Sequence, residues 1–206
     1  MLTTDLLTAL VAFAFVSSIT PGPNNLMLMA SGTNFGFVRS IPHMLGVSIG
    51  FTLMIVLVGA GLAQIFELYP VAHTVLKYAS CAYLLYLAWK IATSAPPGSK
   101  AGAEEKTRPM TFVQAALFQW VNPKAWTMAL TAVSAYTLPA NPFVSLLVVA
   151  SVFGAINLPT VGSWTLMGMQ LRRFLSDPLK LRIFNVTMAV VLVATLYPVV
   201  FGPASH

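Results

Sequence analysis

Two short segments combine residues that break a helix with side chains that bind ligands. The first, residues 20–25, reads Thr-Pro-Gly-Pro-Asn-Asn, and the second, residues 122–124, reads Asn-Pro-Lys. Proline lacks a backbone donor and clashes with the preceding helical turn, so each segment interrupts the apolar run around it. The N–H groups of a restarted helix are unpaired and lie at the positive end of the helix dipole. The two breaks therefore predict a site for a carboxylate.

The candidate binding residues come from these two breaks and from polar positions around them. Asn24 and Asn25 add side-chain donors and acceptors to the first break, and Gln119 flanks the second. For either break alone, a structural kink capped by its asparagine is the alternative. Asn157 precedes Pro159, where it would either line a cavity or bond to the carbonyls that this proline opens. The predicted substrate-binding set is Pro21, Gly22, Pro23, Asn24, Asn25, Gln119, Asn122, Pro123, Lys124 and Asn157.

Lys124 lies near the middle of an apolar run rather than in a connection. A charged lysine at such depth costs roughly 2.5–3.5 kcal/mol, and it usually faces a partner or an aqueous cavity. It would bind a substrate carboxylate or release a proton during a transport cycle. The alternatives are a side chain that snorkels to the interface or pairs with carbonyls freed by Pro123. Because no acidic residue is expected at this depth, we expect a bound anion or carbonyl oxygens beside Lys124.

Asp5 and His43 are the other candidates for proton coupling. Asp5 is expected in the first turn of a helix near the outer surface, where a negative charge is favourable. His43 follows Pro42 and is expected in a loop or cap at the start of the second span. The three histidines have no metal-ligand spacing, and a single cysteine excludes an internal disulfide. The sequence therefore predicts no metal site and no cofactor.

The composition indicates an integral membrane protein. Apolar residues make up 57% of the chain, only 8% are charged, and the mean hydropathy is +0.81. A soluble domain carries roughly a quarter charged residues. The net charge of +6 is therefore interpreted as loop charge facing the cytoplasm, and lipid rather than nucleic acid is the expected partner.

The apolar segments predict an all-α protein with six transmembrane helices. A span needs about 20 apolar residues, and six segments qualify: 6–30, 41–65, 71–91, 112–138, 142–166 and 183–201. The breaks fall in the first and fourth of these. Residues 95–109 are rich in Pro, Gly, Ser and Ala with mixed charges, as in a flexible linker. They separate two three-helix halves, residues 1–94 and 110–206.

Basic residues predict how the chain is oriented. Nine of the eleven fall in connections on one side: Arg39, Lys90, Lys100, Lys106, Arg108, Arg172, Arg173, Lys180 and Arg182. The positive-inside rule places this side in the cytoplasm and both termini outside. Because each half has three spans, the second half enters the membrane from the opposite side to the first. If the two halves are related, they are inverted repeats. Interruptions at corresponding places of two such halves point to the binding site of a transporter.

Two small-residue motifs predict close helix packing. They are Gly32-x-x-x-Gly36 and Gly46-x-x-x-Gly50, which bring helices together within the chain or permit a homodimer.

The sequence resembles the LysE/RhtB family of amino-acid exporters. The run at 18–25, the glycines at 32, 36, 46 and 50, and the run Phe-Gln-Trp-Val-Asn-Pro-Lys-Ala-Trp at 118–126 are similar to that family's two motifs. The resemblance implies efflux of amino acids or their derivatives across the bacterial inner membrane, by exchange with protons. Since no carboxylate is expected at mid-depth, a neutral amino acid fits better than a basic one.

Other classes of function remain as alternatives. These alternatives are export of another small solute, export of a metal ion, and a scaffold role without transport. A metal ion would require several ligands at depth, and these are missing. No nucleophile with a base and no His/Glu pair supports an enzyme. No P-loop is present, so a gradient or a partner would drive any transport.

Overall fold

The computed structural model describes residues 3–62, 64, 68–94, 108–175 and 177–201, and each regular element among them is a helix. The predicted all-α class is therefore confirmed for the described chain. Residues 95–107, most of the predicted linker, lie outside the described residues.

The first predicted span consists of two helices with a bend between them. Helix α1 covers Thr4–Ile19, and helix α2 covers Pro23–Phe35. Their axes differ by 54° across the three residues between them. Pro23 occupies the first turn of α2, where its missing N–H removes no helical hydrogen bond. Asp5 lies exposed in the first turn of α1, as the sequence predicts.

The second and third predicted spans are helices with few interruptions. Helix α3 covers Phe37–Leu57 and continues into the π-helical turn η1, Val58–Leu62. Gly36 joins α2 to α3 with φ of +81°, a left-handed conformation that favours glycine. Helix α5 covers Pro70–Ala92.

The fourth predicted span is broken where the sequence indicates. Helix α6 (Phe112–Phe118) passes into the 3-10 turn η2 (Gln119–Val121), and helix α7 (Pro123–Tyr136) begins after Asn122. Asn122 has an extended backbone, with φ of −95° and ψ of 108°. The remaining helices are α8 (Pro142–Arg172), α9 (Pro178–Ala194) and α10 (Tyr197–Phe201).

By length and apolar character, two helical stretches of the described chain are individually able to cross a membrane. They are Phe37–Leu62 and Pro142–Arg172, and the bent pair α1 and α2 makes a third if it counts as one span. Many large apolar side chains are exposed, including Val75, Tyr78 and Trp89 on α5. Such a surface suits lipid rather than water.

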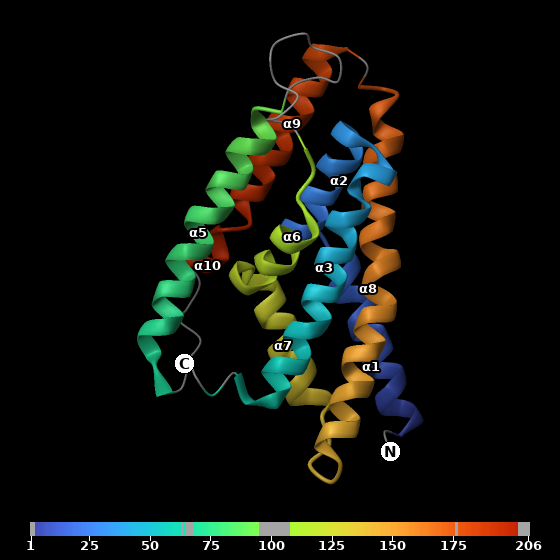
Figure 1. The fold of residues 1–206 in the computed structure, drawn as a ribbon, viewed down its shortest axis with the longest axis vertical. Helices are drawn as coiled ribbons and strands as arrows, with labels where there is room; N and C mark the ends of the chain where they lie inside the picture. The colour runs from blue at the N-terminus through green and yellow to red at the C-terminus, as the bar shows by residue number, and fades with distance from the viewer. Residues whose placement is uncertain (1–2, 63, 65–67, 95–107, 176, 202–206) are drawn as a thin grey trace.

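The long helix α8 runs along one side of the bundle and packs against several other helices (Figure 1). It contacts α1, α2 and α3, while α3 also packs on α6 and α5 packs on α9 (Figure 1). One buried cluster joins α3 and α8 through Phe51 and Phe153, and Phe13 of α1 packs against it. The ring of Phe153 meets those of Phe51 and Phe13 in T-shaped contacts, with centroids 5.6 and 5.9 Å apart. A second joins α2, α6 and α9 through Leu28, Phe118 and Leu192.

The small residues pack within the chain. A side chain at Gly32 would overlap the backbone carbonyl of Thr165, and one at Gly168 would overlap that of Met29. Helices α2 and α8 therefore meet backbone to backbone. Gly46 and Gly50 meet α6 in the same way, whereas Gly36 serves the turn described above. These glycines give no support to the predicted homodimer.

Candidate functional site

The break between α1 and α2 frees carbonyl groups, and other parts of the chain supply their donors. The Asn25 side-chain amide donates to the carbonyls of Ser18 and Thr20, both at 2.8 Å. The Trp164 indole of α8 donates to the carbonyl of Ile19 at 3.1 Å. Irregular backbone is tolerated at membrane depth only when its polar groups are satisfied in this way. Asn25 thus stabilises the break, and Trp164 is a partner that the sequence did not indicate.

Lys124 links the second break to the first. Its ammonium nitrogen donates to the Thr20 carbonyl at 2.7 Å, to the Thr20 hydroxyl at 2.9 Å and to the Pro21 carbonyl at 3.4 Å. Carbonyl oxygens were expected beside this lysine, but they belong to the first break and not to the turn opened by Pro123. In this conformation the ammonium group is held by these oxygens of the first break.

A pair of side-chain amides forms a second link between the breaks. Asn24 donates to Gln119 at 2.8 Å, and Gln119 donates back to Asn24 at 3.2 Å. Gln119 is fully buried and also donates to the Ala115 carbonyl at 2.8 Å. The two breaks are therefore neighbours in space, although about a hundred residues separate them.

The two restarted helices differ in how their first turns are satisfied. The Asn122 side-chain oxygen accepts from the backbone N–H of Lys124 at 3.1 Å and so caps α7. Helix α2 follows Gly22, which has no side chain to cap it. Within the described chain, the N–H groups of Asn24 and Asn25 have no hydrogen-bond acceptor. Of the two starts, α2 is the one left free for an anion.

Gly22 gives Lys124 its position. A side chain built on Gly22 would come within 2.7 Å of the Lys124 Cδ and 3.2 Å of its ammonium nitrogen. Any larger residue at position 22 would push the Lys124 side chain away from its place across the break.

A small cavity of about 20 Å³ lies between the breaks. A single water needs roughly 10–15 Å³, so the space suits one water rather than a larger ligand. Its lining includes six of the predicted binding residues: Gly22, Asn24, Asn25, Asn122, Lys124 and Asn157. Among the other four, Gln119 lies behind Asn24, and the prolines shape the backbone.

Asn157 contributes an unused acceptor to this cavity. Its side chain is 6% exposed, and its amide nitrogen lies 3.5 Å from the Ser18 hydroxyl. Its side-chain oxygen is buried and has no hydrogen-bond partner among the described residues. Of the two alternatives for Asn157, the cavity lining is found and the bond to carbonyls opened by Pro159 is not.

His43 and Asp5 lie away from the two breaks. His43 was expected in a loop or cap, but this is wrong, because α3 begins six residues earlier and buries the ring inside the helix bundle. Asp5 and Thr20 are at opposite ends of α1, about 20 Å apart at 1.5 Å per residue. Neither side chain reaches Lys124.

Comparison with known proteins identifies the family. The family described as LysE type translocator matches residues 15–195. This chain belongs to the LysE type translocators. The chain is therefore a membrane transport protein and not an enzyme, in agreement with the sequence-based prediction.

Several curated relatives carry the name cysteine/O-acetylserine efflux protein. The protein of that name from Escherichia coli K12 is 34% identical over 195 residues, which cover 93% of this chain and 96% of the relative. The one from Escherichia coli O157:H7 is 35% identical over 175 residues, which cover 84% and 87%. No solved structure matches the chain.

Proposed function

We propose that this translocator is a secondary exporter of small neutral amino acids or their derivatives across the bacterial inner membrane. The observation that carries the proposal is the link from Lys124 on α7 to the opened backbone between α1 and α2, with a polar cavity beside it. The names of the cysteine and O-acetylserine efflux relatives favour an amino acid of that size.

The cavity offers complementary groups for both ends of an amino acid. The free N–H groups of Asn24 and Asn25, together with Lys124, suit a carboxylate. The unpaired oxygen of Asn157 suits the ammonium group, which is a donor only. Among the described residues, no acidic side chain lines the cavity, so they offer a basic substrate no counter-charge.

Binding would open the link between the breaks. A carboxylate competes with the Thr20 and Pro21 carbonyls for the Lys124 ammonium, and a charged acceptor makes the stronger hydrogen bond. The cavity has room for about one water, so a substrate fits only if the surrounding helices separate. Substrate binding would thereby favour a different arrangement of the helices, which alternating access requires.

The proposed architecture has six spans in two inverted halves, with both termini outside. In the proposed repeat, α1 corresponds to α6, α3 to α8 and α5 to α9. The contact between α1 and α8 then corresponds to the contact between α6 and α3, and α5 packs on its own counterpart α9. The two breaks occupy corresponding places in the halves. These pairs of contacts support the inverted repeat.

Proton exchange is the proposed source of energy. Lys124 is the titratable group at the site, and among the described residues no carboxylate lies beside it to form a relay. A proton released from Lys124 in one conformation and regained in the other would couple export to the proton gradient.

Counterflow in proteoliposomes tests the proposed function. Vesicles loaded with unlabelled O-acetyl-L-serine should take up labelled O-acetyl-L-serine with saturation, and L-serine and L-cysteine should compete, whereas L-lysine should not. A pH gradient should change the rate of net flux. If none of these amino acids shows saturable flux, the proposal is wrong, and the alternatives of another solute, a metal ion or a scaffold would be tested next.

A further inference from the structure

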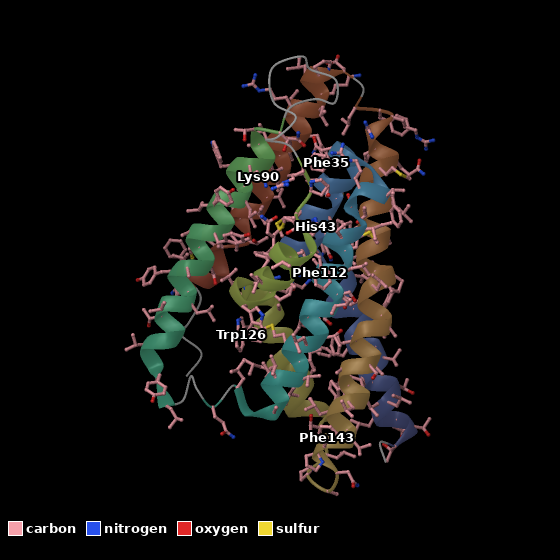
Figure 2. The ribbon with its side chains drawn as sticks, in the orientation of Figure 1. Phe35, His43, Lys90, Phe112, Trp126 and Phe143 are labelled. Atoms are coloured by element: carbon pink, nitrogen blue, oxygen red, sulfur yellow. The ribbon has the colours of Figure 1, made fainter. Side chains whose placement is uncertain are left out.

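A second and larger cavity lies on the side of the predicted cytoplasmic connections. Its volume is about 60 Å³. Its polar lining consists of Ser31, Asn34, His43, Lys90, Ser94 and Arg108. Figure 2 shows Lys90 and Phe35 near the end of the bundle where α5 finishes, with His43 further toward its middle. The cavity therefore leads inward from two basic residues to a histidine.

His43 is an unsatisfied polar group at the inner part of this cavity. The ring is 2% exposed, and neither of its nitrogens has a hydrogen-bond partner among the described residues. A buried polar group without a partner costs about 1–3 kcal/mol. The buried neighbours are satisfied, because Ser31 pairs with Ser40 at 2.8 Å and Asn34 with Asn185 at 2.9 Å. A polar ligand in the cavity would give His43 its missing partner.

The charge of the lining selects the kind of ligand. Lys90 and Arg108 are both positive, and among the described residues no acidic side chain lines the cavity. Neither of these two has an ion-pair partner in the described part of the chain. Two neighbouring cations attract an anionic group, and a carboxylate binds well to arginine and lysine.

The cavity has room for several water-sized groups. Its volume is several times the roughly 10–15 Å³ that one water needs. It is also larger than the cavity of about 20 Å³ between the breaks. In this conformation the basic side therefore offers more room for a ligand than the space between the breaks.

Helix α2 connects the two cavities. Asn24 of this helix lines the cavity between the breaks, and Ser31 of the same helix lines the cavity of Lys90, Arg108 and His43. Seven residues at 1.5 Å each separate these positions by about 10 Å, a distance that one short displacement of a small amino acid covers.

We propose that the cavity of Lys90, Arg108 and His43 is an entry subsite for a small zwitterionic amino acid. Lys90 and Arg108 hold its carboxylate, and His43 hydrogen-bonds its inner end, before the molecule moves to the site between the breaks. This inference rests on the proposed function, because it assigns the first binding step of the same export.

Protection of a single cysteine tests the subsite directly. Ser94 lines the cavity, so a Ser94→Cys variant in a Cys81→Ala background places one thiol there. In inside-out vesicles, O-acetyl-L-serine should slow labelling of this thiol by a maleimide. Lys90→Met or His43→Leu should raise the half-protecting concentration at least tenfold. Lys180→Gln, a change of an exposed basic residue outside the cavity, should alter it less than twofold.

Two further arms separate the subsite from the site between the breaks. Protection should persist when Lys124→Met is added, since Lys124 lines only the cavity between the breaks. If the parent protein transports O-acetyl-L-serine but shows no protection, or if Lys90→Met is protected equally well, the entry subsite is wrong and the proposed function stands. If protection occurs without any transport, the proposed function fails, and the cavity is a binding site for the amino acid but not an entry step of export. Should His43→Leu not fold, Arg108→Gln replaces it in the comparison.

Discussion

At the scale of single residues, the site depends on which polar groups are satisfied. Asn25, Gln119 and Trp164 have their hydrogen bonds within the protein, and so they hold the breaks together. The Asn157 oxygen and the first N–H groups of α2 do not. The satisfied groups hold the two breaks in place, and in the proposed function the groups without a partner among the described residues would bind the ligand.

Removing the ammonium of Lys124 should abolish most transport. We expect Lys124→Met to lower the counterflow rate at least tenfold, because the variant loses its bonds to Thr20 and Pro21 and the charge for a substrate carboxylate. Lys180→Met, at an exposed position, serves as the control and should retain the wild-type rate. Equal rates for the two variants would mean that Lys124 has only a structural role.

Asn157 should show opposite effects on stability and function. An Asn157→Leu variant no longer buries an unpaired oxygen, which costs about 1–3 kcal/mol. We therefore expect an unchanged or higher unfolding temperature in detergent, together with a several-fold higher KM for O-acetyl-L-serine. A variant that loses stability and keeps its KM would assign Asn157 to packing alone.

The sequence located most of the residues that surround the two breaks, because their chemistry is local. Proline ends a helix wherever it occurs, so both breaks follow from composition alone. Partners that come from distant helices do not follow in this way. The Ile19–Trp164 bond joins residues 145 positions apart, and periodicity in one helix cannot show which indole faces another.

At the scale of elements, the contact between α2 and α8 is the tightest part of the bundle. Gly32 and Gly168 each meet a backbone carbonyl of the opposite helix, and the Thr33 hydroxyl donates to the Gly168 carbonyl at 2.9 Å. Sequence reasoning expected small residues at a helix contact but could not identify the partner helix. It also misplaced His43, because Pro42 is accommodated inside α3 instead of preceding it.

Two glycines of α8 should respond differently to the same substitution. Gly168→Ala should destabilise the protein by roughly 1–3 kcal/mol, since the new methyl group would overlap the backbone of Met29. A methyl group at Gly162 would meet only the flexible end of the Met44 side chain, at 3.3 Å. Gly162→Ala should therefore leave the stability of the protein unchanged or raise it slightly. Thermal unfolding of the two variants in the same detergent measures the difference, and equal melting temperatures would contradict the backbone contact.

At the scale of the whole molecule, apolar side chains cover the outside and polar side chains gather within. Buried Asn25, Asn122, Asn157 and Asn185 lie inside, while large apolar residues are exposed on the surface. The composition predicted this arrangement, since a chain with 8% charged residues cannot cover itself with polar groups. Orientation in the membrane depends instead on the loop charges.

Reporter fusions test that orientation. A periplasm-dependent phosphatase fused after residue 206 should be active, and a fluorescent protein that matures only in the cytoplasm should be dark there. The same fluorescent protein inserted after residue 100 should be bright, because nine basic residues mark that side as cytoplasmic. Bright fluorescence at the C-terminus would reverse the proposed topology.

The backbone contact between α2 and α8 also leads to an expectation about which helices move together. The two backbones touch at Gly32 and Gly168, and the Thr33 hydroxyl bonds across the contact, so we expect α2 and α8 to move as one body. Yet α2 belongs to the first half of the chain and α8 to the second. The flexible joint for α1 is then residues 20–22, whose carbonyls are held by replaceable side-chain bonds. On this expectation, the parts that move during transport would not coincide with the two halves of the sequence.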